Sequence, residues 1–316
     1  MPRKLVCALG VFDGVHLGHA KILLRALKES EKINGNAAAV TFHMHPKNVV
    51  SPGYVPEALT SAEEKRDLMR GLGIRNIYTI EFTKAFSMLE PEAFARKILA
   101  KKLRPAAVVA GTNFRFGRRR AGNMAALNAL GAELGFRVIS VPLFRLGGKN
   151  VSSTGIRNLI RKGRVVEAAK MLGRHYSLAG TVARGNGIGR KLGFPTANLK
   201  IQDKAVPSTG VYAVKAGISG GIYDAVCNIG VNPTFNRLNK NVSVEIHVLS
   251  WSKSLYGKRI KVWFIGRLRN ERRFVNASSL KKQIAKDIIA ASRMLRTSNL
   301  SVGGAPRHSS GLSEAV

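Results

Sequence analysis

The sequence predicts a two-domain protein, in which an α/β domain with a parallel sheet precedes an all-β barrel and a closing helix. The chain has 316 residues, about twice the roughly 150 residues of a typical domain. Strand-like and helix-like runs alternate in its first half, whereas short β-branched runs follow Tyr176. We therefore predict domains at residues 1–176 and 177–296. Residues 297–316 are rich in Ser and Gly, which predicts a disordered tail.

The first domain is predicted from apolar runs of strand length that alternate with helices of about 10–15 residues, a pattern typical of parallel βαβ units. Strands are expected at 5–12, 37–42, 77–80, 106–110 and 137–141, and helices at 20–32, 62–72, 91–103 and 121–135. Two short helices that each end at a glycine, 154–162 and 164–172, connect the domains.

The second domain is predicted from short runs that Gly, Asn and Pro turns separate. These runs lie at 178–183, 211–216, 223–229, 242–249 and 259–265. Such spacing is typical of a barrel or a sandwich, and we predict a barrel. A helical pattern at 279–295 closes the domain.

Composition indicates a globular protein outside the membrane. Hydrophobic residues make up 45% of the chain, and no run reaches the roughly 18 apolar residues of a membrane helix. The apolar run at residues 5–9 is too short for a signal peptide. Cys7 and Cys227 lie in apolar runs, which favours two reduced core thiols and a cytoplasmic location.

The charge is unusually positive, with 52 Lys and Arg against 18 Asp and Glu, a net charge of +34. Such a field attracts polyanions without specificity. The basic residues are spread along the whole chain, and no zinc-finger, RNA-recognition or basic-zipper pattern is present. We therefore expect no specific nucleic acid, although a basic nucleic-acid-associated protein stays an alternative.

A candidate phosphate site follows the first strand and opens the first helix. His16 and His19 are three residues apart and can both face one ligand, and Gly14 and Gly18 allow close backbone approach. A helix N-terminus favours bound anions, and histidines can stabilise charge that grows on a phosphate. A plain turn with incidental histidines is the alternative.

A second motif lies far along the chain. Ser152, Ser153 and Thr154 precede a helix that carries Arg157 in its first turn. Hydroxyl residues there often only cap the helix. Together with the His-x-Gly-His turn, however, this motif resembles the nucleotidylyltransferase superfamily, which implies a Rossmann-like domain whose two motifs bind the ATP triphosphate.

Further motifs extend the resemblance to prokaryotic bifunctional riboflavin kinase/FAD synthetases. They include Thr41-Phe42 and the run from Gly111 to Gly117. The resemblance implies that Phe42, Asn113 and Phe116 lie on the flavin side, and core packing is the alternative for Phe42 and Phe116. The chain departs from the family at His43 and Met44, where an aspartate and a proline are usual, and at Gly155, where an arginine is usual.

The most specific run spans residues 185–198. It is neither a P-loop nor a dinucleotide fingerprint. A loop of glycines with adjacent cations can nonetheless bind phosphate, and its candidates are Gly185, Gly187, Gly189, Arg190 and Lys191. Thr196 and Asn198 are two residues apart and would share one face of a strand. Their oxygens suit Mg²⁺.

This run resembles the riboflavin kinase module, and the similarity extends through residues 228–235, 245–247 and 269–274. It implies that Glu245 is the catalytic base. An exposed residue on an alternating strand is the alternative, and His247 is expected to be structural. The resemblance implies riboflavin, FMN and ATP as substrates, with Mg²⁺. We predict phosphorylation of riboflavin to FMN and adenylylation of FMN to FAD. A kinase with a degenerate first domain remains an alternative, and weak self-association stays open.

Overall fold

The computed structural model of the chain describes residues 4–43, 46–50, 57–185, 187–201, 204–231 and 242–298. The chain divides into two compact units, Met1–Ser153 and Thr154–Val302. The boundary predicted at residue 176 lies after the two connecting helices and stays a prediction. Residues 299–316, the greater part of the predicted tail, lie outside the described residues.

The first unit contains a parallel sheet with strand order β3-β2-β1-β4-β5. Its strands are β1 (Leu5–Leu9), β2 (Asn36–Phe42), β3 (Asn76–Ile80), β4 (Ala107–Gly111) and β5 (Arg137–Val141). The chain runs outward from β1 to β3 and then returns to β4, so the strand order reverses between β1 and β4. Ligands of open α/β sheets bind at the carboxyl ends of the strands near such a reversal.

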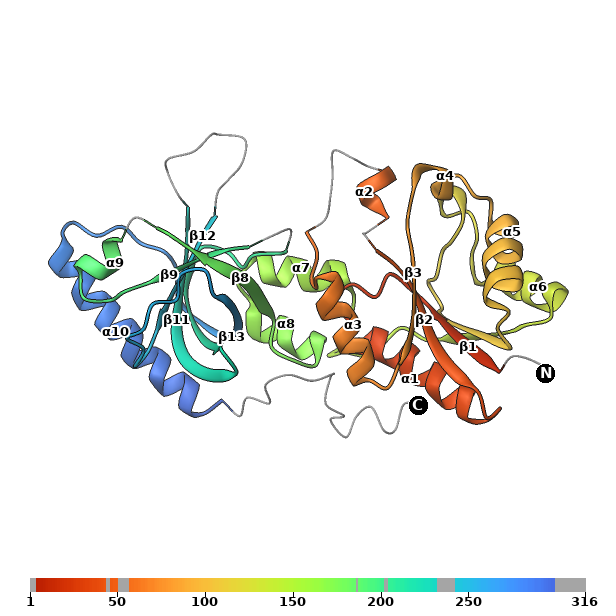
Figure 1. Ribbon diagram of the computed structural model, residues 1–316, viewed down its shortest axis with the longest axis horizontal. Helices are drawn as coiled ribbons and strands as arrows, with labels where there is room; N and C mark the ends of the chain where they lie inside the picture. The colour runs from red at the N-terminus through yellow and green to blue at the C-terminus, as the bar shows by residue number, and fades with distance from the viewer. Residues whose placement is uncertain are drawn as a thin grey trace. The chain divides into compact units, whose positions relative to one another are not determined.

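Helices cover both faces of this sheet, and alternate strand residues point to opposite faces. Val6, Ala39 and Val109 join one hydrophobic cluster with the helices on one face, whereas Cys7, Val40 and Val108 join the cluster on the other. Figure 1 shows α1 and α3 on one side of the strands, with α5 and α6 on the other. This two-sided burial explains why the strands are continuous apolar runs.

The four helices predicted in the first unit are present with small shifts, and the short segments α2, α4 and η2 were not predicted. They are α1 (Leu17–Glu31), α2 (Lys47–Val50), α3 (Ala62–Gly71), α4 (Lys84–Ser87), α5 (Pro91–Phe94), the π-helix η1 (Ala95–Leu103), the 3-10 turn η2 (Arg118–Arg120) and α6 (Met124–Leu134). A short hairpin joins β6 (Arg145–Leu146) to β7 (Lys149–Asn150). The single helix predicted at 91–103 is thus two segments, because its last part is π-helical.

The second unit is a closed six-stranded barrel with strand order β10-β11-β12-β9-β8-β13. Its strands are β8 (Ser177–Ala183), β9 (Ala197–Lys200), β10 (Gly210–Ile218), β11 (Gly221–Val231), β12 (Val242–Val248) and β13 (Arg259–Arg269). Its helices are α8 (Val165–Leu172), α9 (Ile188–Lys191) and α10 (Ala277–Arg296), whereas α7 (Ser153–Arg161) begins at Ser153, the residue where the first unit ends. The predicted barrel is confirmed. Strand β9, only four residues long, was absent from the predicted barrel runs, although Thr196 and Asn198 were expected on a strand.

Helix α10 closes the second unit, as predicted, and lies along the outside of the barrel (Figure 1). Its residues Ala291 and Leu295 are buried against Val211, Val226 and Ile265 of the barrel. No helix among the described residues is long and apolar enough to cross a membrane.

Candidate active sites

The turn after β1 carries the first predicted site, and its backbone is tightly constrained. Phe12, Gly14 and Val15 all have positive φ angles, of 51°, 82° and 36°. Only glycine adopts such angles readily, so the two other residues must be held by their surroundings. Asp13 supplies part of that support, because its buried carboxylate accepts hydrogen bonds from the N–H groups of Leu59 at 2.9 Å and Thr60 at 3.3 Å.

His16 and His19 lie together, as the spacing predicted. Their rings stack with centroids 3.6 Å apart and an angle of 16° between the planes. His16 is the N-cap of α1, and its Nδ1 accepts the backbone N–H of His19 at 3.2 Å. An accepting Nδ1 carries no proton, so neutral His16 is protonated on Nε2. Its Nδ1 therefore holds the helix start rather than donating to a phosphate.

The second motif meets this turn through Ser153. The Ser153 hydroxyl donates to the Asp13 carbonyl at 2.9 Å, across 140 positions of sequence. Ser152, which is exposed, precedes it. Ser153 of the second motif thus contacts the turn that carries the first motif. Thr154 and Arg157 follow on α7, where Arg157 Nη1 donates to Thr154 Oγ1 at 3.5 Å.

The barrel carries the second predicted site, where two residues of neighbouring strands meet a third that lies just before one of those strands. Asn198 of β9 stands opposite Glu245 of β12 in the antiparallel register. The Thr196 hydroxyl donates to Glu245 Oε2 at 3.4 Å. Burial raises the pKa of Glu245, and the hydrogen bond from Thr196 acts in the opposite direction. A carboxylate with a raised pKa at such a cluster is suited to accept a proton.

Thr196 is not on the strand, which corrects one prediction. Strand β9 begins at Ala197, so Thr196 lies just before it and approaches Asn198 through their shared neighbour Glu245. His247 makes a hydrogen bond that fits the expected structural role, because its Nδ1 donates to the Pro195 carbonyl at 2.9 Å. That bond holds the chain segment that positions Thr196.

The glycines of the loop pack against this cluster. A Cβ at Gly185 would collide with the side-chain amide of Asn198, and one at Gly189 would come within 3.1 Å of Thr196 Oγ1. Gly187 has a φ of +69°. The loop therefore needs glycine for packing and conformation, in addition to any phosphate binding. Arg190 is exposed on α9. Asn186 and the side chain of Lys191 lie outside the described part of the chain.

Comparison with known proteins assigns each unit to an enzyme family. The FAD synthetase family profile matches residues 1–155, and the riboflavin kinase profile matches residues 172–295. The bifunctional riboflavin kinase/FMN adenylyltransferase of Buchnera aphidicola (subsp. Schizaphis graminum) is 36% identical over 283 residues, which cover 89% of this chain and 91% of that protein. This chain belongs to the bifunctional riboflavin kinase/FMN adenylyltransferase family.

Other relatives agree over the same length. The Bacillus subtilis member of this family is 36% identical, and the match covers 90% of each chain. A crystal structure of a Streptococcus pneumoniae protein, named as a macrolide-efflux protein, matches with a TM-score of 0.84 at 28% identity. The match covers 92% of this chain and 95% of that one, so the two-unit fold is shared over nearly the whole length.

The residues expected on the flavin side lie in different environments. Phe42 is half-buried, and its ring contacts Phe82 with centroids 5.2 Å apart. Asn113 is exposed. Phe116, by contrast, is only 6% exposed within a hydrophobic cluster, so its observed environment is the core. Half-buried Phe114 stacks on it at 5.7 Å.

The departures from the family pattern lie at two places. His43 is exposed at the end of β2, and Met44 lies outside the described residues. Gly155 is on α7. The phosphate, flavin and metal roles of the predicted residues stay predictions.

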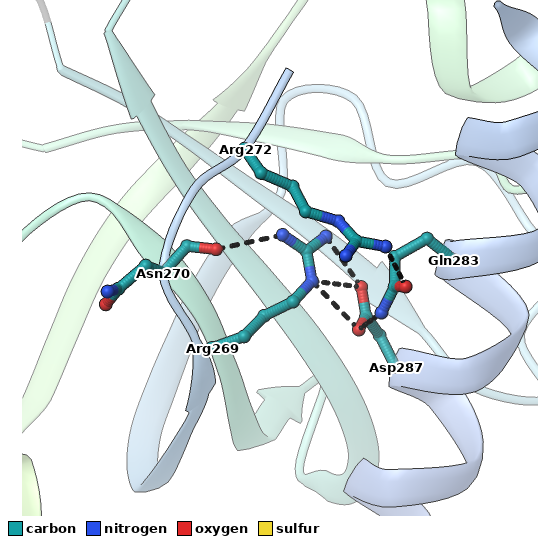
Figure 2. Close-up of polar contacts among 5 residues, drawn as sticks. All are labelled: Arg269, Asn270, Arg272, Gln283 and Asp287. Atoms are coloured by element: carbon teal, nitrogen blue, oxygen red, sulfur yellow. Dashed lines mark hydrogen bonds and ion pairs between the residues drawn. The ribbon is translucent and has the colours of Figure 1, made fainter. Parts of the chain in front are cut away.

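A polar cluster anchors the segment between β13 and α10, which contains part of the riboflavin kinase match (Figure 2). Arg269 Nε donates to both Asp287 oxygens at 3.0 Å, and its Nη2 donates to Oδ2 at 2.8 Å. Gln283 donates to Asp287 Oδ1 at 2.7 Å and accepts from Arg272. The cluster ties this segment to the closing helix.

Two supporting residues of the first site were missed from the sequence. Asp13 braces the turn, and Lys65 of α3 donates to the end of β2. An acid at a strand end, in a chain with only 18 acids, was a usable signal for Asp13. Lys65 carried no such signal, because the sequence of an amphipathic helix does not distinguish a lysine that donates to buried carbonyls from an exposed lysine.

Proposed function

We propose that the chain phosphorylates riboflavin to FMN in its second unit and adenylylates FMN to FAD in its first. The observation that carries the proposal is the meeting of Thr196, Asn198 and Glu245, in a chain whose two halves match the two enzyme families. These three residues come from segments about 50 positions apart, and they offer one base and two neutral oxygen ligands.

In the kinase reaction Glu245 is the base. Its carboxylate takes the proton of the ribityl 5′-hydroxyl as that oxygen attacks the γ-phosphorus of ATP, and ADP leaves. A general base of this kind contributes about 10²–10⁴-fold to the rate. The raised pKa of Glu245 strengthens it as a base, since a carboxylate with a higher pKa holds the transferred proton better.

Mg²⁺ fits the donors beside Glu245. The Thr196 hydroxyl and the Asn198 amide oxygen are hard ligands, and Mg²⁺ takes few protein oxygens together with water and substrate phosphates. Thr196 and Asn198 would hold the ion, which when bound neutralises charge on the phosphates. The glycine loop with Arg190 and Lys191 would lie along those phosphates.

In adenylyl transfer a phosphate oxygen of FMN attacks the α-phosphorus of ATP, and pyrophosphate leaves as the α–β bridging bond breaks. His16 and His19, at the N-terminus of α1, would stabilise the charge that develops on the phosphorus oxygens. Gly14, Gly18 and the hydroxyls of 152–154 would bind the triphosphate with Arg157. Phe42 and Asn113 would contact the flavin. Phe116 would support the flavin side indirectly, because its ring stacks on that of Phe114.

The proposed substrates are riboflavin, FMN and ATP, and the proposed location is the cytoplasm. Both cysteines, Cys7 and Cys227, are free and buried, which fits a reducing compartment. The charge of +34 predicts salt-sensitive, non-specific binding of polyanions.

A time course with riboflavin and MgATP tests the proposal, with products separated by chromatography. FMN followed by FAD is the expected result. FMN alone would favour the kinase with a degenerate first unit, for which Gly155 and His43 are the sequence argument. If neither flavin forms and the protein binds duplex DNA tightly at physiological salt, the nucleic-acid alternative gains support. Chelation of Mg²⁺ should stop both reactions, and added Mg²⁺ should restore them.

A further inference from the structure

Residues 59–65 of the first unit hold the turn of residues 11–19 (the histidine turn) by hydrogen bonds, although they belong to neither phosphate motif. Residues 59–65 run into the start of α3, where Ser61 caps the helix in a reciprocal capping box with Glu64. Leu59 and Thr60 donate to Asp13, as described above, and Gly14 donates its N–H to Thr60 Oγ1 at 3.1 Å. The turn and this segment are therefore hydrogen-bonded in both directions.

Lys65 extends this hydrogen bonding beneath the carboxyl ends of two strands. Its ammonium group donates to the Phe42 carbonyl at 2.8 Å, to Thr41 Oγ1 at 3.3 Å and to the Val11 carbonyl at 3.4 Å. The Thr41 hydroxyl itself donates to the Val11 carbonyl at 2.9 Å. An ammonium group has three donors, and here they match three acceptors, one beyond β1 and two on β2.

The charge of Lys65 is held at some cost. Burial lowers the pKa of Lys65, while the nearby Asp13 carboxylate acts in the opposite direction. A neutral donor could make such bonds without the free-energy cost of burying a charge. The position of the Lys65 ammonium group suggests what offsets this cost, because the group joins the histidine turn after β1 to the predicted flavin residue Phe42 at the end of β2.

We propose that Lys65 is a positioning residue for adenylyl transfer, which holds the histidine turn and Phe42 in register so that ATP and FMN meet in line. The inference rests on the proposed function of the first unit. Lys65 acts through the chain, since its donors are used by Val11, Thr41 and Phe42. Its loss should therefore lower kcat more than it raises KM.

Lys65→Met removes the ammonium group and keeps an unbranched side chain of similar length. We expect FAD formation from supplied FMN to lose about 100-fold in kcat, the order that a misplacement of about 1 Å can cost. KM for ATP and for FMN should stay within about threefold, because no substrate contact is removed. Riboflavin phosphorylation by the same protein should be unchanged, since that site belongs to the second unit.

Arg70→Met is the matched control, because Arg70 is on the same helix and its side chain is 62% exposed. It makes the same change of charge and should keep full FAD formation. Lys65→Arg, which restores the charge and the donors, should recover most of the activity lost in Lys65→Met.

Hydrogen exchange gives a readout that does not depend on catalysis. The amides of Gly14 and Val15 in the turn are hydrogen-bonded to Thr60 and Phe12, and we expect them to exchange at least about 10-fold faster in Lys65→Met than in Arg70→Met. The β1 amides should keep their protection, which shows that the unit is folded. Equal exchange at the turn, or FAD formation within threefold of the control, would overturn the proposal.

Thr41→Val is the milder variant if Lys65→Met does not fold. It removes one of the three acceptors and the bond to Val11 in a residue of nearly the same shape, and we expect a loss of about 5–10-fold in kcat. No loss in that variant would also overturn the proposal. If the wild-type chain makes FMN but no FAD, the proposed adenylyl transfer fails, and the exchange comparison alone decides whether Lys65 holds the turn.

Discussion

Removing the charge of Asp287 should weaken the second unit by a predictable amount. The Asp287 side chain is 7% exposed and that of Arg269 is 21% exposed, and three charge-assisted hydrogen bonds join them (Figure 2). Breaking a fully buried pair costs about 3–5 kcal/mol. Because Arg269 keeps partial access to water and asparagine keeps one acceptor, we expect Asp287→Asn to cost about 2–3 kcal/mol.

That cost corresponds to a fall of about 5–10 °C in the unfolding midpoint of a unit of about 150 residues. The chain has two tryptophans, Trp251 and Trp263, and both belong to the second unit. Thermal unfolding followed by tryptophan fluorescence therefore reports on this unit selectively. Riboflavin phosphorylation measured below the transition then tells whether the anchored segment also matters for catalysis.

Glu167→Gln makes the same chemical change at an exposed ion pair. The side chain of Glu167 is 43% exposed and that of its partner Arg164 is 53% exposed. It should leave the midpoint unchanged, because exposed pairs contribute little. The double variant Arg269→Met with Asp287→Leu removes both charges, and should recover much of the stability lost in Asp287→Asn. If Asp287→Asn and Glu167→Gln unfold at the same temperature, the reasoning about the buried pair is wrong.

The remaining predictions concern the two reactions. Glu245→Gln should lower FMN formation by about 10²–10⁴-fold and leave FAD formation from supplied FMN intact; a loss below tenfold would mean that another group is the base. Because burial raises the pKa of Glu245, its reactive carboxylate is lost as pH falls through that raised pKa. The kinase kcat should thus rise with pH, with an inflection above the usual carboxyl range, and an inflection within that range would contradict the assignment. His16→Ala removes the ring and the N-cap of α1, and should lower FAD formation by about 10²-fold with FMN formation unchanged; equal loss of both products would instead indicate a folding defect.

The sequence determined most of the local elements and indicated two candidate sites. The strands of the parallel sheet were predictable, because burial on both faces makes each one a continuous apolar run. The barrel strands were predictable from their β-branched runs and turns. Motifs such as residues 11–19 and 185–198 identified the chemistry, because their glycines, histidines and hydroxyls are adjacent in the chain. The same motifs placed the protein in its family.

Only the tertiary structure decided the contacts that support those motifs. The place of β9 in the barrel escaped prediction, because its four residues carry too short a pattern and become a barrel strand by pairing with β12 and β8. Phe116 packs in a core cluster of residues distant in sequence. Lys65 likewise donates hydrogen bonds to Val11 and Phe42, which are distant from it in sequence. The hydrophobic period and the turn residues encode local conformation. A salt bridge or a hydrogen bond between distant residues depends instead on which segments the fold brings together. The packing of the whole unit decides this, and it cannot be read from one segment of the sequence.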